Sequence, residues 1–223
     1  MAHTDDSGSE SFVPALGWHW LTRLYDPFIA LTLRERAVKQ QLVDQAMLAP
    51  GQRVLDFGCG TGTLALLLKR ACPGAEVIGV DVDPAVLALA RRKVARAGLD
   101  IALRQGFFTA ETFPPAHFDR IVSSLVLHHL TRDEKLAVLR AMHAALRPGG
   151  TLHVVDFGPP HTALMRALGH LTGHAAGGDR AADNLAGRLP AIVAEAGFAD
   201  VQTLGQRATP FGSLAYLRAR HAA

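Results

Sequence analysis

Two hydrophobic periodicities alternate along most of the chain. Short apolar runs at 53–57, 76–80, 101–104, 118–123 and 151–156 have the length and the flanking residues of buried strands. Between them, apolar residues recur every three or four positions, as in helices that cover the face of a sheet. This alternation predicts an α/β fold, a doubly wound, Rossmann-like and mostly parallel sheet of seven strands.

Helix-end signals support this pattern. Asp83-Pro84 offers an N-cap followed by proline at the first helical position, and Gly98 supplies a stop. Thr131 to Glu134 match a capping box, and that helix is expected to end at "RPGG", residues 147–150. The sequence therefore predicts helices over about 83–97 and 131–146.

The last part of the chain follows a looser pattern. One helix is expected over 181–196, with Gly197 ending it. The stretches "ADVQTLGQ" and "GSLAYLRARH" are expected to form the last two strands, joined by a loop around Pro210. These two strands complete the predicted sheet.

The N-terminal region is polar first and helical afterwards. Residues 1–12 are predicted to be a disordered tail, and residues 13–48 a helical lid. Residues 49–223 then form the main domain. A basic, tryptophan-bearing helix in the lid leaves open a peripheral contact with a membrane surface.

Composition limits the classes of protein. A chain of 223 residues that is 49% hydrophobic can bury the core of one domain. The net charge is +3 and the arginines are spread out, so we expect no nucleic-acid partner. Two cysteines, a polar N-terminus and the lack of an apolar span predict a soluble, cytoplasmic protein without stable membrane insertion.

A glycine-rich loop separates the first strand from the next helix. The stretch "VLDFGCGTGTLALLL" places Gly58, Gly60 and Gly62 at alternate positions, two residues after Asp56. A dinucleotide fingerprint has the spacing Gly-x-Gly-x-x-Gly, and a phosphate-binding P-loop needs Gly-Lys-Ser/Thr. A buried carboxylate would repel a pyrophosphate and attract a cation. A nicotinamide-dependent oxidoreductase is a second hypothesis, and both the glycine spacing and Asp56 argue against it.

Four stretches, in order, resemble motifs of the class I S-adenosylmethionine-dependent methyltransferases. They are "VLDFGCGTG", "VIGVDVDP", "FDRIVSSLVLHHL" and "LRPGGTLHVVDF". The resemblance covers about residues 20–160. Within the family, the chain is most similar to the small-molecule branch that includes the quinone-biosynthesis C-methyltransferases.

The resemblance implies a binding site for S-adenosylmethionine. Asp56 and the glycines would line the methionine moiety, Asp81 would accept hydrogen bonds from the ribose, and Val82 would pack on the adenine. The family often has Gly-Asp-Ala before the fourth strand, whereas this chain has Gly106-Phe107-Phe108, so stacking or backbone contacts would hold the adenine. The candidate cofactor contacts are Tyr25, Asp56, Gly58, Gly60, Asp81, Val82, Gly106, Phe107 and Ser123.

The catalytic candidates are His128, which follows the fourth strand, and Asp156, which ends the fifth strand. His128 could act as a base, because histidine titrates near neutrality, or could pack at a helix entry. Asp156 could orient a substrate or pair with a nearby histidine, or could cap a helix. His19, Trp20 and His129 are candidate substrate contacts. The histidines show no familiar metal-ligand spacing, so we expect no metal.

The predicted function is transfer of a methyl group from S-adenosylmethionine to a small-molecule acceptor, with S-adenosylhomocysteine as product. The acceptor atom, O, N, S or C, stays open. Ser123-Ser124-Leu125 replaces the Asp/Asn-Pro-Pro-aromatic motif of amino-methylating nucleic-acid enzymes. A lipid or quinone acceptor at a membrane surface and a non-catalytic cofactor-binding protein are the alternatives. The chain is expected to be a monomer or a homodimer.

Overall fold

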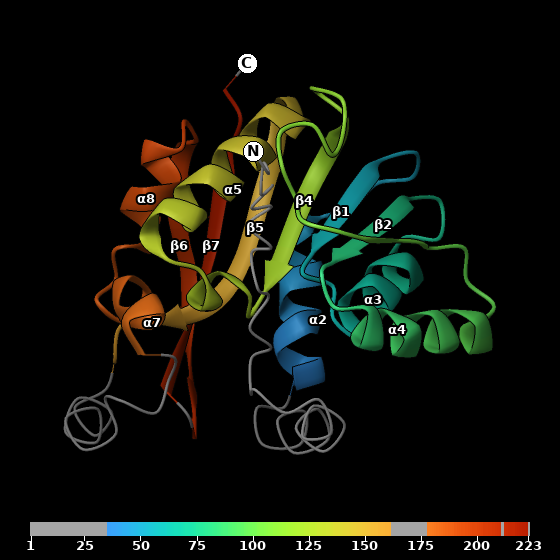
Figure 1. The fold of residues 1–223 in the computed structure, drawn as a ribbon, viewed down its shortest axis with the longest axis horizontal. Helices are drawn as coiled ribbons and strands as arrows, with labels where there is room; N and C mark the ends of the chain where they lie inside the picture. The colour runs from blue at the N-terminus through green and yellow to red at the C-terminus, as the bar shows by residue number, and fades with distance from the viewer. Residues whose placement is uncertain (1–34, 162–177, 211, 223) are drawn as a thin grey trace, which may run out of the picture.

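The structure, a computed structural model, describes residues 35–161, 178–210 and 212–222. A central sheet has helices on both faces (Figure 1). The strands are β1 (Arg53–Phe57), β2 (Glu76–Asp81), β3 (Ala102–Gln105), β4 (Phe118–Ser124), β5 (Leu146–Gly158), β6 (Ala199–Thr209) and β7 (Gly212–Arg220). The helices are α2 (Glu35–Ala46), α3 (Thr63–Ala71), α4 (Pro84–Ala97), the short 3-10 helix η1 (Leu127–His129), α5 (Arg132–Ala145), α7 (Gly178–Leu185) and α8 (Leu189–Glu195).

The strand order confirms the predicted sheet. The order is β3-β2-β1-β4-β5-β7-β6; β7 runs antiparallel to both of its neighbours, β5 and β6, and the pairs from β3 to β5 are parallel. β1 pairs with β2 on one side and with β4 on the other. The strand order therefore reverses direction beside β1, and ligands of doubly wound sheets bind at the carboxyl ends of the strands at such a point.

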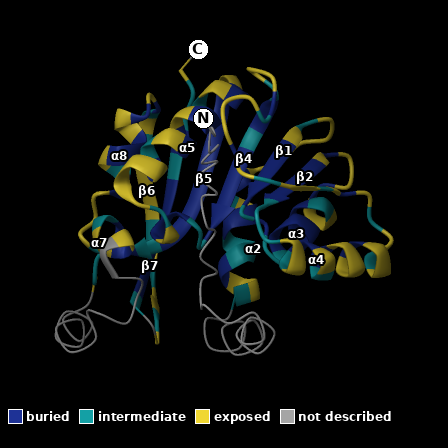
Figure 2. Ribbon diagram, in the orientation of Figure 1, coloured by how far each residue is buried: buried dark blue, intermediate teal, exposed yellow. Residues whose placement is uncertain are grey.

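Each face of the sheet has its own hydrophobic cluster. Side chains from α2 and α3 pack on one face with Val54, Val122 and Tyr216. Side chains from α5 and α8 pack on the other face with Leu55 and Val154. The inner strands are largely buried, whereas the edge strands β3 and β6 and the outer sides of the helices are exposed or half-buried (Figure 2). A sheet covered on both faces explains why its strands are continuous apolar runs in the sequence.

Local signals located two helices correctly. The Asp83 side chain accepts a hydrogen bond from the Ala85 N–H at 2.7 Å and opens α4, and Gly98 ends the helix with φ 62°. The capping box of Thr131 and Glu134 opens α5. In both cases a side chain satisfies an N–H group that the first helical turn leaves without a partner.

Two boundaries differ from the prediction. Residues 181–196 do not form one helix: the chain breaks between α7 and α8 at Gly187, which adopts a left-handed φ of 73°. Strand β5 covers 146–158 rather than 151–156, because its first residue, Leu146, already pairs with Phe118 of β4. The Pro-Gly-Gly stretch, 148–150, lies within the range of β5 but forms an irregularity there: these residues have no partner on β4, and Gly149 has a left-handed φ of 76°.

The described part of the predicted lid is helix α2. Val38, Leu42, Val43 and Ala46 of this helix are buried against the sheet and α3. The Tyr216 hydroxyl also donates a hydrogen bond to the Val38 carbonyl at 3.3 Å. This helix is therefore a layer of the core, and a lid formed by 13–34 lies outside the described residues.

Within the described parts of the chain, no helix has the length and apolar character needed to span a bilayer.

Candidate functional site

The glycine loop after β1 is built from left-handed backbone conformations. Gly58, Gly60 and Gly62 have φ values of 65°, 52° and 77°. A Cβ on Gly58 would lie 2.9 Å from Val126 Cγ1, so the loop packs directly against the segment that leads into η1. A Cβ on Gly60 would meet no atom within 4 Å. The backbone at Gly60 therefore borders open space that a ligand could approach closely.

Asp81 stands at the carboxyl end of β2 and holds this loop. Its Oδ2 accepts a hydrogen bond from the Gly60 N–H at 2.8 Å, and its Oδ1 accepts one from the Asp83 N–H at 3.0 Å. Burial raises the pKa of Asp81, while these two hydrogen bonds oppose the rise. Each carboxylate oxygen retains a second lone pair, so the side chain could also accept bonds from the hydroxyls of a ribose.

Asp56 is the buried carboxylate in front of the glycines. Asp56 is 1% exposed, and its Oδ2 has no hydrogen-bond partner within the described residues. Burial raises the pKa of Asp56 to about 7, against the charge of Lys39 and a hydrogen bond from the Ala65 N–H. A buried oxygen without a donor is costly, and a cationic ligand with N–H donors would satisfy it.

The ends of β3 and β4 complete the edge of this site. The Gly106 N–H donates a hydrogen bond to the Asp81 carbonyl at 3.0 Å, which places the β3 end beside β2 and Val82. Phe107 is 66% exposed, and it is the neighbouring Phe108 that is buried, edge-on to Phe57. An exposed aromatic ring at this edge could stack on a planar base.

Ser123 lies at the carboxyl end of β4, beside β1. It is fully buried, pairs in register with Phe57, and its Oγ has no partner within the described residues. The adjacent Ser124 Oγ is also without a partner there. The predicted cofactor residues of the described chain therefore gather along the carboxyl ends of β1, β2, β3 and β4.

His128 and Asp156 form a buried pair at the ends of β4 and β5. The His128 Nδ1 lies 2.8 Å from the Asp156 Oδ1, and His128 is 7% exposed. The Asp156 Oδ2 accepts hydrogen bonds from the Leu127 N–H at 2.7 Å and the His128 N–H at 3.3 Å, and its Oδ1 accepts one from the Phe157 N–H at 2.7 Å. Three of the four contacts are to backbone N–H donors, so Asp156 acts as an ionised acceptor.

Charge and hydrogen bonding keep Asp156 ionised. Burial by itself would raise the pKa of Asp156, but the charge of His128 and the hydrogen bonds from His128, Phe157 and Leu127 hold that pKa below its ordinary value. An ionised acceptor selects the tautomer in which the His128 Nδ1 carries a proton. In the neutral ring of this tautomer, the His128 Nε2 carries no proton and can accept one.

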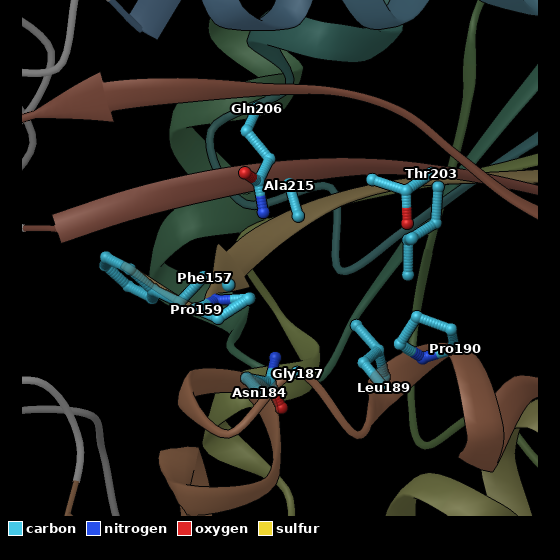
Figure 3. A pocket seen from close by; sticks show the side chains of 11 residues that line it. Phe157, Pro159, Asn184, Gly187, Leu189, Pro190, Thr203, Gln206 and Ala215 are labelled. Atoms are coloured by element: carbon cyan, nitrogen blue, oxygen red, sulfur yellow. The ribbon is translucent and has the colours of Figure 1, made fainter. Parts of the chain in front are cut away.

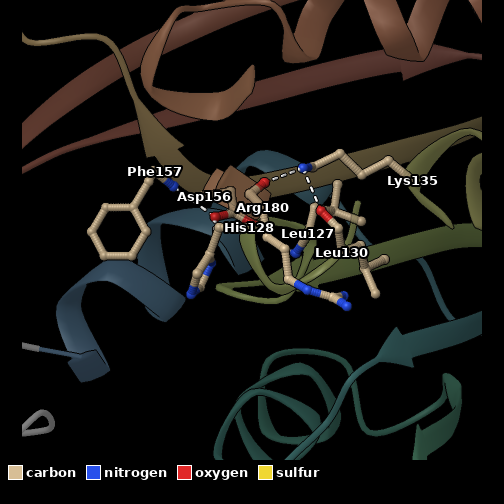
Figure 4. Close-up of polar contacts among 7 residues, drawn as sticks. All are labelled: Leu127, His128, Leu130, Lys135, Asp156, Phe157 and Arg180. Atoms are coloured by element: carbon tan, nitrogen blue, oxygen red, sulfur yellow. Dashed lines mark hydrogen bonds and ion pairs between the residues drawn. The ribbon is translucent and has the colours of Figure 1, made fainter. Parts of the chain in front are cut away.

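Three further contacts fix the position of η1, and Figure 4 shows the two that Lys135 makes. Lys135 is fully buried, and its Nζ donates hydrogen bonds at 2.6 Å to the carbonyls of Leu130 and Arg180. The Arg180 Nη1 donates to the His129 carbonyl at 3.0 Å. These bonds tie α7 to the end of η1 and to the chain that follows it. The Phe157 ring packs edge-on to His128 with 4.8 Å between centroids.

Sequence reasoning missed Lys135 and the role of Arg180. A lysine in the first turns of a charged helix is usually solvated, and no local signal shows that two carbonyls from separate segments surround it. His129, a predicted substrate contact, is exposed, with its ring centroid 3.9 Å from that of His128. His19, Trp20 and Tyr25 lie outside the described residues.

The described chain offers little other chemistry. Cys59 and Cys72 are buried free thiols, and burial raises the pKa of the Cys59 thiol, so it is a poor nucleophile. Residues 35–161, 178–210 and 212–222 hold no group of three or more His, Cys, Asp or Glu side chains arranged for a metal ion.

Known proteins match this chain in sequence and in fold. A family model described as a methyltransferase domain matches residues 54–150. The chain is 38% identical over 122 residues to a demethylmenaquinone methyltransferase of Thermus thermophilus, covering 55% of this chain and 54% of that protein. It is 34% identical over 139 residues to the ubiquinone/menaquinone biosynthesis C-methyltransferase UbiE of Coxiella burnetii, covering 60% and 54%. The chain thus spans about half the length of the curated relatives it matches.

A solved structure shares the whole architecture. The S-adenosylmethionine-dependent methyltransferase SibL, in its apo form, has a TM-score of 0.69 over 95% of this chain and 60% of its own, at 23% identity, which shows the fold. Residues 54–150 thus resemble a methyltransferase domain, and the chain has the Rossmann-like fold of a solved S-adenosylmethionine-dependent methyltransferase. Over 122 and 139 residues its sequence is similar to two proteins named for quinone biosynthesis.

Proposed function

We propose that this chain transfers a methyl group from S-adenosylmethionine to a small molecule whose acceptor group loses a proton. The observation that carries the proposal is the His128–Asp156 pair beside the glycine loop. Val126, which meets Gly58, is two residues before His128. The proton acceptor and the donor site are thereby brought to one edge of the sheet.

Three features of the glycine loop fit S-adenosylmethionine. The ligand carries a positive sulfonium, an amine and a ribose, and it has no phosphate. The partnerless Oδ2 of Asp56 would accept from the amine, the carboxylate of Asp81 would accept from the ribose hydroxyls, and the space at Gly60 would admit the ligand. Val82, Gly106, Phe107 and Ser123 would border the adenosine. When bound, the cofactor supplies a methyl group on an electron-poor sulfur.

His128 has the role of general base in this proposal. Asp156 accepts the Nδ1 proton and fixes the ring, so Nε2 takes the proton that a phenol, an enol or a carbon acid loses on methylation. The protein's other contribution is alignment and the exclusion of water. An acceptor that reacts as a thiolate or a neutral amine would not need this base.

A quinol is the first acceptor to test, because the chain's relatives are named for menaquinone and ubiquinone biosynthesis. Lys135 and Arg180, which tie α7 to η1, would act as positioning residues for the base. His129, and His19, Trp20 and Tyr25 of the N-terminal region, are proposed contacts of the acceptor or the lid. We propose a cytoplasmic monomer or homodimer, and the free thiols of Cys59 and Cys72 suit a reducing compartment.

The test measures S-adenosylhomocysteine formation against a panel of quinols, phenols, thiols, amines and lipids. His128→Ala is expected to leave S-adenosylmethionine affinity within about threefold and to lower turnover on a phenol or quinol by about 10²–10⁴. Equal turnover of the variant and the parent would assign His128 to packing. Absence of turnover on every acceptor, with intact cofactor binding, would support a non-catalytic binding protein instead.

A further inference from the structure

A pocket of about 70 Å³ lies between the sheet and the α7–α8 turn, apart from the predicted cofactor residues. Phe157 to Pro159 at the end of β5 form one wall, and Leu189 and Pro190 of α8 form another (Figure 3). Gly187 closes the rim, since a Cβ there would lie 3.3 Å from Pro159 Cγ. None of the lining residues is charged.

The Asn184 amide faces this pocket without a hydrogen-bond partner. Asn184 is 1% exposed, and within the described residues neither its Oδ1 nor its Nδ2 has a partner. The amide lies on the α7 side of the pocket, opposite Thr203 and Gln206 of β6 (Figure 3). A buried amide can accept through its oxygen and donate through its nitrogen, and leaving both unpaired is costly.

The pocket lies one strand away from the His128–Asp156 pair, on the same face of the sheet. Asp156 is paired in register with Ala215 of β7, and Ala215 is paired with Gln206 of β6. Side chains in register on neighbouring strands point to the same face. Ala215 and Gln206 both line the pocket, so a molecule held there would lie beside the proposed transfer centre.

We propose that this pocket is a binding site for a neutral small molecule that carries a carboxamide or a lactam. Such a group offers a donor and an acceptor side by side, the complement of the Asn184 amide. The apolar side chains of Leu189, Pro190 and Leu217 take the rest of the molecule. An anion or a cation is excluded, because a buried charge without a counter-charge is unfavourable.

Butyramide and butyrate are matched probes for this site, because they have the same shape and differ in charge. Binding is followed by NMR without S-adenosylmethionine, from the Asn184 side-chain N–H2 and Ala215 backbone signals. Butyramide is expected to shift both signals and to saturate at about 1–10 mM, as a small fragment should. Butyrate is expected to bind at least about tenfold more weakly.

Asn184→Leu keeps the size of the side chain and is expected to weaken butyramide binding at least about tenfold at the Ala215 signal. Should that variant unfold, Thr203→Val with Gln206→Ala removes polar groups from the exposed rim and is expected to weaken binding severalfold. Gln202→Ala, on the opposite face of β6, is the control and should bind as the parent does. No saturable shift, equal binding of butyrate, or unchanged binding in the Asn184 and rim variants would overturn the proposal. Because methyl transfer is not measured, failure here leaves the proposed function untouched.

Discussion

Replacing Asp156 with asparagine tests the proposed base most directly. The carboxylate accepts hydrogen bonds from four donors: the His128 ring and the N–H groups of Leu127, His128 and Phe157. Asparagine has one acceptor oxygen, and its NH₂ group must face some of these donors. With NH₂ in place of Oδ1, the Phe157 N–H loses its partner and the His128 ring must change tautomer; with NH₂ in place of Oδ2, the Leu127 and His128 N–H groups lose theirs.

The size of the effect follows from these contacts. A buried N–H without an acceptor costs about 1–3 kcal/mol, and the lost charge-assisted bond to the histidine costs about 1.5–3 kcal/mol. We therefore expect Asp156→Asn to lower the free energy of unfolding by about 3 kcal/mol in urea titrations. If the His128 Nδ1 becomes the acceptor, Nε2 carries the proton and turnover should fall by about 10²–10⁴.

Two measurements separate the chemical effect from the structural one. The ¹⁵N shifts of the His128 ring report its tautomer without an acceptor substrate, and we expect the proton on Nδ1 in the parent. Calorimetry should show S-adenosylmethionine affinity within about threefold of the parent, because Asp156 does not contact the glycine loop. Asp133→Asn, an exposed residue of α5, is the control. A folded Asp156→Asn protein with parental turnover, or a parent ring protonated only on Nε2, would refute the reasoning.

The remaining predictions concern the donor site and the core. Gly60→Ala and Gly51→Ala each place a side chain on a left-handed backbone position that has no atom within 4 Å, so each variant should lose about 1–2 kcal/mol of stability. Only Gly60→Ala should weaken S-adenosylmethionine binding, by tenfold or more in calorimetry. Equal affinities of the two variants would mean that the ligand lies elsewhere. Asp81→Asn should weaken that binding by about 10–100-fold, from about 1.5–3 kcal/mol of lost bonding, whereas Asp100→Asn should not change it. Because the pKa of Asp56 is near 7, its carboxyl group is neutral at low pH and attracts a cationic ligand less. The affinity for S-adenosylmethionine should therefore fall between pH 7 and 5.5 by up to about tenfold per pH unit. Asp56→Asn should remove this pH dependence. Burial and the charges of Arg120 and Arg218 lower the pKa of His153 to about 3, below its value in the unfolded chain. The stability that the neutral His153 contributes is therefore complete above pH 6.5 and is lost as the pH falls, by about 1.4 kcal/mol between pH 7.5 and 5.5. Urea titrations should no longer show this loss in His153→Leu.

The features that the sequence predicts correctly depend on residues close together in the chain. The capped starts of α4 and α5, the glycine loop and Asp81 are short-range patterns, and each is where the pattern places it. Gly187 was overlooked because a single glycine inside an apolar helical pattern is often tolerated. The early start of β5 was overlooked because it depends on the pairing of Leu146 with Phe118 of β4, a residue 28 positions earlier in the sequence.

The acceptor side depends on residues that are distant in the sequence. His128 and Asp156 are 28 positions apart, and only the adjacency of β4 and β5 makes a pair of them. Pairing with a nearby histidine and capping a helix were both open alternatives for Asp156, and the structure shows both: Asp156 pairs with His128 and accepts the first N–H groups of η1. Lys135 and Asn184 could not be predicted, because their burial depends on where α7 packs.

The geometry of the His128–Asp156 pair indicates which class of methyl acceptor the proposed reaction uses, which the glycine loop does not. The loop concerns only the donor, which is the same for every member of the class. A histidine whose Nδ1 is held by a carboxylate and whose Nε2 is free accelerates a reaction only when the acceptor gives up a proton. A phenol, a quinol or a carbon acid has this property at neutral pH, and a thiolate does not. The His128–Asp156 pair therefore favours weak acids among small molecules, and the ratio of phenol to thiol turnover, which should collapse in His128→Ala, is the quantity that decides it.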